Sequence, residues 1–262
     1  MEHLGFIGMG SMAGALAQGF ISSGALRKDQ VFAYAPHQEK LKVNAERIGF
    51  VPVATLGELA EKADTLLLAC KPYQIEGVVA ELRDQLCGKA LISVAAGWDF
   101  ERYQKVLPEG VRFQFVMPNT PAMVKEGVLL FEDRNSLEPE ERAQIMELFA
   151  SVGVVEEIPS ALMGIAGTIT GCGPAFIDLL IEAYADAAVK YGVPRAQAYP
   201  LVAQMVKGSA ALQLETKEQP GVLKDQVCSP GGTTIRGVCA LEEDGFRSAC
   251  IHSIDAIMKP GA

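Results

Sequence analysis

The residues Gly8, Gly10 and Ala13 stand at the spacing G-x-G-x-x-A, between a short apolar run and a stretch of helix-spaced apolar residues. A glycine at the first position permits a tight turn, and one at the second lets the backbone approach a pyrophosphate closely. The free N–H groups and the dipole at the start of the following helix favour negative charge. In this strand-to-helix context the motif predicts a dinucleotide-binding loop, and the alternative is a glycine turn with a structural role only.

The end of the next predicted strand, near residues 34–37, favours one type of dinucleotide. A site specific for NAD usually places Asp or Glu there to hold the ribose 2′-hydroxyl. No acidic residue stands between this strand and Gln38, so a 2′-phosphate would meet no repulsion. His37, Lys40 or Lys42 could supply positive charge, although all three also suit solvated helix positions. We therefore expect NADPH to be preferred, with NADH as the alternative cofactor.

Three short loops follow predicted strands of the same sheet, at residues 69–72, 93–97 and 117–121. Ligands of open α/β sheets bind beyond the carboxyl ends of the strands, where these loops would lie. The small residues of 93–97 leave room for a ribose or a nicotinamide ring. Asn119 offers both a donor and an acceptor, which suits it to orient a ribose or a carboxamide. Each loop taken singly also fits ordinary turn chemistry, but three on one sheet indicate a binding site.

The C-terminal half carries a second glycine pair, Gly231 and Gly232, within the segment SPGGTT that begins at Ser229. An apolar helical run follows, so successive N–H groups at the helix start would form a second anion site, suited to a substrate carboxylate. The hydroxyl of Thr234 can both donate and accept, so it could hold a nitrogen atom at the reacting centre. The alternative is an ordinary helix N-cap formed by Ser or Thr.

The elements that would position the first set of loops alternate between strands and helices up to about Pro159. This alternation predicts a doubly wound, mostly parallel sheet. The strand candidates cover residues 3–8, 30–34, 51–53, 65–70, 90–94, 111–116, 128–131 and 154–158. The expected fold class is therefore α/β, with a Rossmann-type domain over residues 1–159.

Only helical patterns occur beyond that point, so we expect an all-α domain over residues 160–262. A long helical stretch over residues 162–191 should be interrupted at residues 171–174, which hold two glycines and a proline. Pro200 should kink the next helix, and Pro220-Gly221 should form a turn.

Composition and charge argue against several classes of protein, namely binders of nucleic acid or anionic membranes, metalloproteins, and secreted or membrane-spanning proteins. The net charge is −9, which argues against binding to nucleic acid or to an anionic membrane, because phosphate contacts need clustered Lys and Arg. The six cysteines form no C-x-x-C pair and no metal-ligand spacing with the three histidines. No signal peptide is visible, and no uninterrupted apolar stretch reaches the roughly 20 residues of a membrane helix. We expect a cytoplasmic protein with reduced thiols and no bound metal.

Taken together, the motifs resemble those of the pyrroline-5-carboxylate reductase family over essentially the whole chain. The segments that carry the resemblance are residues 5–12, 71–72, 93–97, 117–122, 170–176 and 220–242. The last segment begins PGVLKDQVCSPGGTT and is highly specific for that family, whereas the N-terminal loop alone is not. Thr170 and Cys172 stand where the family commonly has Ser, and both changes are small.

The resemblance implies a reduction of 1-pyrroline-5-carboxylate to L-proline, the last step of proline biosynthesis, by hydride transfer from NAD(P)H to the C=N carbon. It also implies a homodimer formed through the C-terminal helices, which in the family often assembles further into a decamer. Family cofactor contacts map to Gly8, Met9, Gly10, Ser11, Met12, Ala35, Pro36, Ala69, Cys70, Lys71, Pro72, Ala95, Ala96 and Gly97. Substrate contacts map to Ser229, Gly232, Thr233 and Thr234, and the Gly231 amide would join them. Thr234 would be the catalytic residue, hydrogen-bonded to the ring nitrogen.

Two alternatives stay open. Another imine reductase or a β-hydroxyacid reductase of this architecture would use the same N-terminal loop, but the β-hydroxyacid enzymes carry a Lys on the long central helix, and residues 171–182 hold none. A non-catalytic dinucleotide sensor would combine an intact glycine loop with damaged substrate loops, and both sets are intact here.

Overall fold

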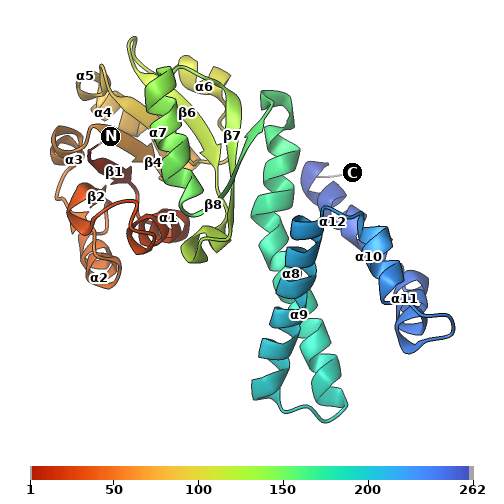
Figure 1. The fold of residues 1–262 in the computed structure, drawn as a ribbon. Coiled ribbons are helices and arrows are strands. Elements are labelled where there is room, and N and C mark those ends of the chain that lie inside the picture. Colours follow the sequence, from red (N-terminus) through yellow and green to blue (C-terminus); the bar gives the residue numbers. More distant parts are fainter. Residues whose placement is uncertain (1, 260–262) are drawn as a thin grey trace. The chain divides into compact units, whose positions relative to one another are not determined.

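The computed structural model describes residues 2–259. They form two compact units that divide between Pro174 and Ala175, here called the sheet unit and the helical unit (Figure 1). The change from strands to helices comes earlier, after β8 (Gly153–Ile158). Residues 160–174 nevertheless belong to the sheet unit. The side chain of Met163 lies in the core of that unit and is 4% exposed. The domain limits of 1–159 and 160–262 stay a prediction.

The sheet has eight strands in the order β3-β2-β1-β4-β5-β6-β7-β8. All neighbours are parallel except β6 and β7, so the predicted mostly parallel sheet and each of its predicted strands are confirmed. The strands are β1 (Leu4–Ile7), β2 (Val31–Tyr34), β3 (Val51–Pro52), β4 (Thr65–Leu68), β5 (Ala90–Ser93), β6 (Arg112–Met117), β7 (Gly127–Asn135) and β8. The central strands β1, β4 and β5 are buried along their whole length, which explains their continuous apolar runs.

Helices cover both faces of this sheet (Figure 1). On one face lie α1 (Ser11–Ser22), α2 (Gln38–Ile48) and α7 (Pro139–Ala150). On the other lie α3 (Leu56–Lys62), α4 (Ile75–Glu81), α5 (Arg83–Leu86) and α6 (Phe100–Gln104). Each layer encloses its own core, around Phe20 and Phe149 on the first face and around Tyr103 and Phe113 on the second. Because each βα crossover returns over the sheet, the carboxyl ends of the parallel strands are left free for loops.

Helix α8 (Met163–Lys190) runs without a break through Pro174, so the interruption expected at residues 171–174 is wrong. A proline inside a helix has no N–H to donate to the carbonyl four residues earlier, which here belongs to Thr170. The side-chain Nδ2 of Asn119 donates to that carbonyl oxygen instead, at 3.1 Å. A donor from the loop after β6 therefore replaces the hydrogen bond that the helix lacks.

The helical unit contains the rest of α8 and the helices that follow it. These are α9 (Arg195–Thr216), α10 (Pro220–Gln226), α11 (Thr233–Glu243) and α12 (Phe246–Met258). Helix α8 ends just before Gly192, whose φ of +97° lies in the left-handed region common at helix C-termini. The turn expected at Pro220-Gly221 is wrong, because α10 begins at Pro220, a first helical position where the missing N–H would have no helical partner. Helix α9 is continuous through Pro200, and the kink expected there stays a prediction.

Few side chains of the helical unit are buried. Its apolar cluster, within the part of the chain that the structure describes, consists of Ala185, Ala198 and Val202 with partly buried neighbours. The segment Ser160–Lys190 is long and apolar enough to cross a membrane by length and composition, with 6% of its most apolar stretch buried. The prediction made from the sequence concerned an uninterrupted apolar run, and it is not contradicted, because Thr168, Thr170 and Asp178 interrupt this segment.

Candidate functional site

The turn after β1 depends on a glycine at position 8. Gly8 has φ of +97°, in the left-handed region, and its N–H donates to the carbonyl oxygen of Tyr34 at 2.8 Å. A Cβ at this position would lie 2.8 Å from the carbonyl oxygen of Ala69. Gly8 therefore brings the carboxyl ends of β1, β2 and β4 together more closely than any other residue would allow.

The start of α1 has the features of an anion site. Gly10 is the N-cap residue, no side chain caps the helix, and the first turn contains no acidic residue. A Cβ added to Gly10 would meet nothing within 4 Å, so the backbone faces open space. The N–H groups of the first turn are thus available to a pyrophosphate, whose charge the helix dipole favours.

A cavity of about 230 Å³ lies beyond these strand ends. Of the predicted cofactor residues, it is lined by Gly8, Met9, Gly10, Ala35, Pro36, Ala69, Cys70 and Lys71. No cofactor contact was predicted for four further lining residues. Leu41 and Asn44 lie on α2, Val78 lies on α4, and Gln74 comes just before α4. One signal could have found Asn44, since it stands one helical turn after Lys40 and shares its face. The predicted residues that do not line the cavity are Ser11, Met12, Pro72, Ala95, Ala96, Gly97 and Asn119, and their cofactor contacts stay predictions.

The charge of this cavity suits a phosphorylated ligand. Its lining contains His37, Lys40 and Lys71 and no Asp or Glu, whereas Lys42 is not part of it. Burial raises the pKa of the Cys70 thiol, so this residue is protonated at neutral pH and contributes no thiolate charge or nucleophile. No group of His, Cys, Asp and Glu side chains in residues 2–259 is arranged to hold a metal ion.

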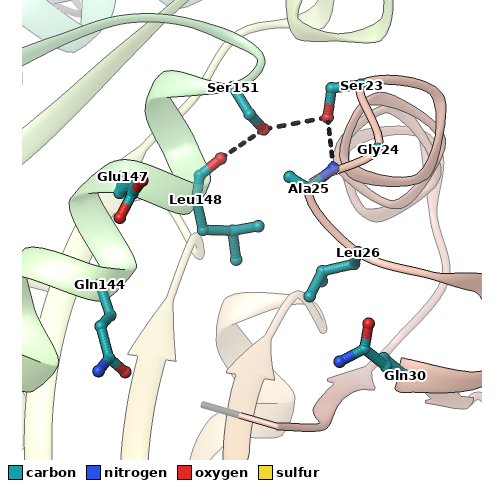
Figure 2. Close-up of a pocket in the computed structure, with 9 residues that line it drawn as sticks. All are labelled: Ser23, Gly24, Ala25, Leu26, Gln30, Gln144, Glu147, Leu148 and Ser151. Atoms are coloured by element: carbon teal, nitrogen blue, oxygen red, sulfur yellow. Dashed lines mark hydrogen bonds between the residues drawn. The ribbon is translucent and has the colours of Figure 1, made fainter.

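A larger pocket of about 610 Å³ lies at the other end of α1 (Figure 2). There the hydroxyl of Ser23, just after the helix, donates to Oγ of Ser151 at 3.2 Å, and Ser151 donates to the Leu148 carbonyl. Since α1 runs back from the carboxyl end of β1, this pocket lies toward the amino ends of the strands. Ligands of such sheets bind at the opposite edge, so the smaller cavity is the stronger candidate despite its size.

Asn119 has a structural role in this fold. Its side chain is 6% exposed, its Oδ1 accepts the N–H of Val128 at 2.8 Å, and its Nδ2 donates to Thr170. Both ends of the amide are therefore engaged within the sheet unit. An amide has two lone pairs on its oxygen and two hydrogens on its nitrogen. The predicted contact of Asn119 with a cofactor would use the second lone pair or the second hydrogen, because the first of each is already engaged.

The predicted substrate residues lie together at the start of α11. Gly231 has φ of +70°, and the N–H of Gly232 donates to the Ser229 carbonyl at 2.9 Å. The N-cap residue is Gly232, and no side-chain hydrogen bond caps the helix, so the alternative of a Ser or Thr cap is wrong. Thr233 and Thr234 are exposed residues of the first turn. The helix start thus offers free N–H groups and nearby hydroxyls to an anionic ligand.

Two family models match the chain, one in its C-terminal part and one in its N-terminal part. Residues 160–261 match the family described as pyrroline-5-carboxylate reductase dimerisation. Residues 3–97 match the family described as NADP oxidoreductase, coenzyme F420-dependent. The first contains the glycine-rich start of α11, and the second contains the cavity-lining loops.

Full-length relatives agree with these matches. The pyrroline-5-carboxylate reductase of Treponema pallidum is 43% identical over 98% of both chains, and that of Escherichia coli is 38% identical over 98% of this chain and 96% of its own. The crystal structure of the Plasmodium falciparum pyrroline carboxylate reductase with NADP bound is similar, with a TM-score of 0.89, 31% identity, and coverage of 98% of this chain and 96% of that one. The chain therefore belongs to the pyrroline-5-carboxylate reductase family.

Proposed function

We propose that this chain reduces 1-pyrroline-5-carboxylate to L-proline, the last step of proline biosynthesis, with NADPH as the preferred cofactor. The observation that carries the proposal is the match along nearly the whole chain to relatives named for this activity. The cation-lined cavity and the uncapped start of α11 supply binding groups for the two anionic ligands that such a reaction needs.

The substrate carboxylate would bind the N–H groups of residues 231–234. A helix start without a capping side chain has unsatisfied donors and a favourable dipole, and α11 has both. The hydroxyl of Thr234 would hydrogen-bond the ring nitrogen and fix the orientation of the C=N bond. Ser229 and Thr233 would complete the contacts around the carboxylate.

The bound dinucleotide supplies the hydride that the C=N carbon accepts. A cyclic imine is basic enough to arrive substantially protonated, so the ring nitrogen needs no strong acid from the protein. The task of Thr234 and the glycine amides is then to orient the substrate, which lowers the barrier by placing the reacting atoms in position.

The test is the loss of NADPH absorbance when 1-pyrroline-5-carboxylate is added, compared between the wild type and Thr234→Ala. We expect kcat/KM to fall by about tenfold to a hundredfold, the value of one hydrogen bond to a charged group. The control Thr216→Ala removes a hydroxyl that bonds its own helix at the Leu212 carbonyl, and should leave turnover unchanged. A fully active Thr234→Ala enzyme would remove the catalytic role. A wild type that binds NADPH without turnover would favour the dinucleotide sensor.

Lys40 provides the test of cofactor preference. It lines the cavity beside His37, whereas Lys42 on the same helix does not. We expect Lys40→Gln to raise the KM for NADPH by about fivefold to tenfold and to leave the KM for NADH unchanged, because only the 2′-phosphate loses a charge partner. Lys42→Gln should change neither value. Equal KM values for the two cofactors in the wild type would contradict the preference.

We further propose that the chain works as a cytoplasmic homodimer joined through its C-terminal helices, with a decamer as a higher assembly. The support is the exposed apolar surface of α8, which falls inside the dimerisation family match. Sedimentation without detergent would measure the assembly, with dimer and decamer as the two supporting masses. A chain that remains in the membrane fraction would instead assign Ser160–Lys190 to a bilayer.

A further inference from the structure

The loop at residues 94–97 is tied to the sheet by one buried hydroxyl. Ser93, the last residue of β5, is 0% exposed, and its Oγ accepts the N–H of Ala95 at 3.1 Å. The same Oγ lies 2.6 Å from the hydroxyl oxygen of Tyr103, so the two side chains share a hydrogen bond. The position of the Ala95 backbone therefore depends on a Ser hydroxyl that is itself held from α6.

Tyr103 is held in place by packing as well as by this hydrogen bond. Its side chain is 0% exposed, and its ring contacts those of Trp98 and Phe113, with centroids 5.0 Å and 4.2 Å away. Burial raises the pKa of Tyr103, so the hydroxyl stays neutral at any physiological pH. The side chain thus offers a fixed, uncharged partner to Ser93.

Trp98 holds the other end of the loop. It is 3% exposed, packs on Tyr103, and carries the Arg102 guanidinium 3.9 Å above its ring. Between the two anchors, Ala96 and Gly97 are exposed, and Gly97 has φ of +81°. The exposed tip is therefore shaped from beneath by a buried network that includes Ser93, Tyr103 and Trp98.

This loop lies beside the dinucleotide cavity. Strands β4 and β5 are parallel neighbours with Leu68 opposite Ser93, and Ala69 to Lys71, just after β4, line the cavity. The N–H of Val94 donates to the Leu68 carbonyl at 2.9 Å, which continues the pairing into the loop. Adjacent strands lie about 4.8 Å apart, so the loop tip is within reach of a ligand that fills the cavity and extends along this edge.

We propose that Tyr103 is a positioning residue that, through Ser93, sets the loop at residues 94–97 in the shape that receives the dihydronicotinamide half of the dinucleotide. The inference rests on the proposed function, because the cofactor contact of this loop is itself a proposal. Tyr103 lies beneath the loop and reaches the ligand only through the backbone that it positions.

The test is Tyr103→Phe, which keeps the ring and removes the hydroxyl. Trp98 is the single tryptophan of the chain, so its fluorescence reports this loop directly during a titration with NADPH. We expect the Kd for NADPH to rise by about threefold to tenfold, as for the loss of one buried hydrogen bond, with an unchanged KM for 1-pyrroline-5-carboxylate. The control Tyr191→Phe removes a hydroxyl from an 82% exposed side chain and should match the wild type.

Ser93→Ala provides the second variant. If Tyr103 acts through Ser93, the double variant should weaken NADPH binding no more than the stronger single variant does. Additive losses would show that Tyr103 does not act through Ser93, and a lower unfolding temperature with unchanged NADPH affinity would show a structural role only. Either result would overturn the inference. Binding is measured without the second substrate, so an enzyme that binds NADPH but does not reduce the imine would refute the proposed function and still decide the role of Tyr103. A wild type that does not bind NADPH would overturn both.

Discussion

The two units of this chain place their apolar side chains in opposite ways. In the sheet unit, Phe20, Phe131 and Phe149 are fully buried, and the first two pack against the ring of Phe149. In the helical unit, the described residues of α11 and α12 include none that is buried, and Leu179 is 66% exposed. A domain becomes stable by covering its apolar faces. The sheet unit therefore carries a complete core, whereas the helical unit needs a further surface to complete its own.

The largest expected effect tests the core of the sheet unit. Phe149→Ala removes a ring whose centroid lies 5.3 Å from that of Phe20 and 5.4 Å from that of Phe131. We expect the free energy of unfolding to fall by about 3–5 kcal/mol in urea denaturation followed by Trp98 fluorescence. Tyr191→Ala, whose side chain is 82% exposed in the helical unit, should leave this transition nearly unchanged. Equal losses would contradict the contrast between the units.

The next effect tests the incomplete surface of the helical unit. Leu179→Asp places a carboxylate among apolar neighbours such as Phe176 and Leu180, in a groove of about 530 Å³. If a second copy covers this groove, the buried charge should weaken association by about 2–4 kcal/mol, seen as dissociation in sedimentation. Val43→Asp, which changes a 63% exposed side chain of the sheet unit, is the matched control and should leave the mass unchanged. An intact assembly of Leu179→Asp would place the interface elsewhere.

A smaller effect concerns α8, which belongs to both units. Asn119→Ala leaves the Val128 N–H and the Thr170 carbonyl without their partner, and we expect a loss of about 1–3 kcal/mol of stability. Pro174→Ala restores a helical N–H for that carbonyl, so the double variant should recover part of the loss in the same urea assay. Strictly additive losses would show that Asn119 does not compensate for the proline.

The smallest effect is pH dependent and concerns only the sheet unit. Glu132 is 1% exposed, and its Oε1 has no hydrogen-bond partner among the described residues. Burial raises the pKa of this carboxyl, so the folded state binds the proton more tightly than the unfolded state does. Its contribution to stability is then fully present below the ordinary pKa of a carboxyl and is lost as the pH rises through the raised value.

Glu132→Gln, which cannot ionise, should therefore raise the free energy of unfolding at neutral pH by up to about 1 kcal/mol. The gain should shrink as the buffer becomes acidic, which thermal unfolding across a pH series would measure. Glu218→Gln changes an exposed carboxyl of the helical unit and should show no such trend. A gain that stays constant with pH would mean that shape, not ionisation, causes it.

Sequence patterns predicted the strands and the glycine turn because residues close together in the sequence determine both. A four-residue apolar run such as that of β4 suffices for a strand buried on both faces, and Gly8 follows from its place between β1 and α1. The continuity of α8 could not be predicted in this way, since the donor that compensates for Pro174 comes from Asn119, distant in sequence. The start of α10 was missed for another reason, because Pro-Gly suits a turn and a first helical turn equally.

The residues of the candidate site also fall into two groups, those that a sequence motif predicts and those that only the fold brings to the cavity. The positions of Gly8 and Gly10 at the cavity follow from motif spacing, whereas Val78 reaches the cavity only because α4 returns over the sheet. The pairing of Ser93 with Tyr103 was beyond prediction, since both residue types are common and nothing in their spacing marks a shared hydrogen bond.

The hydrogen bond between Asn119 and the Thr170 carbonyl also has a consequence for biosynthesis. A ribosome delivers the N-terminal part of a chain first, and domains generally fold as they emerge. Asn119 and most of the strands around it therefore leave the exit tunnel before Pro174 does, so the donor exists when the defective turn of the helix is made. In a circular permutant that begins at residue 160, the helix would emerge first, with a carbonyl that has no donor until translation is nearly complete.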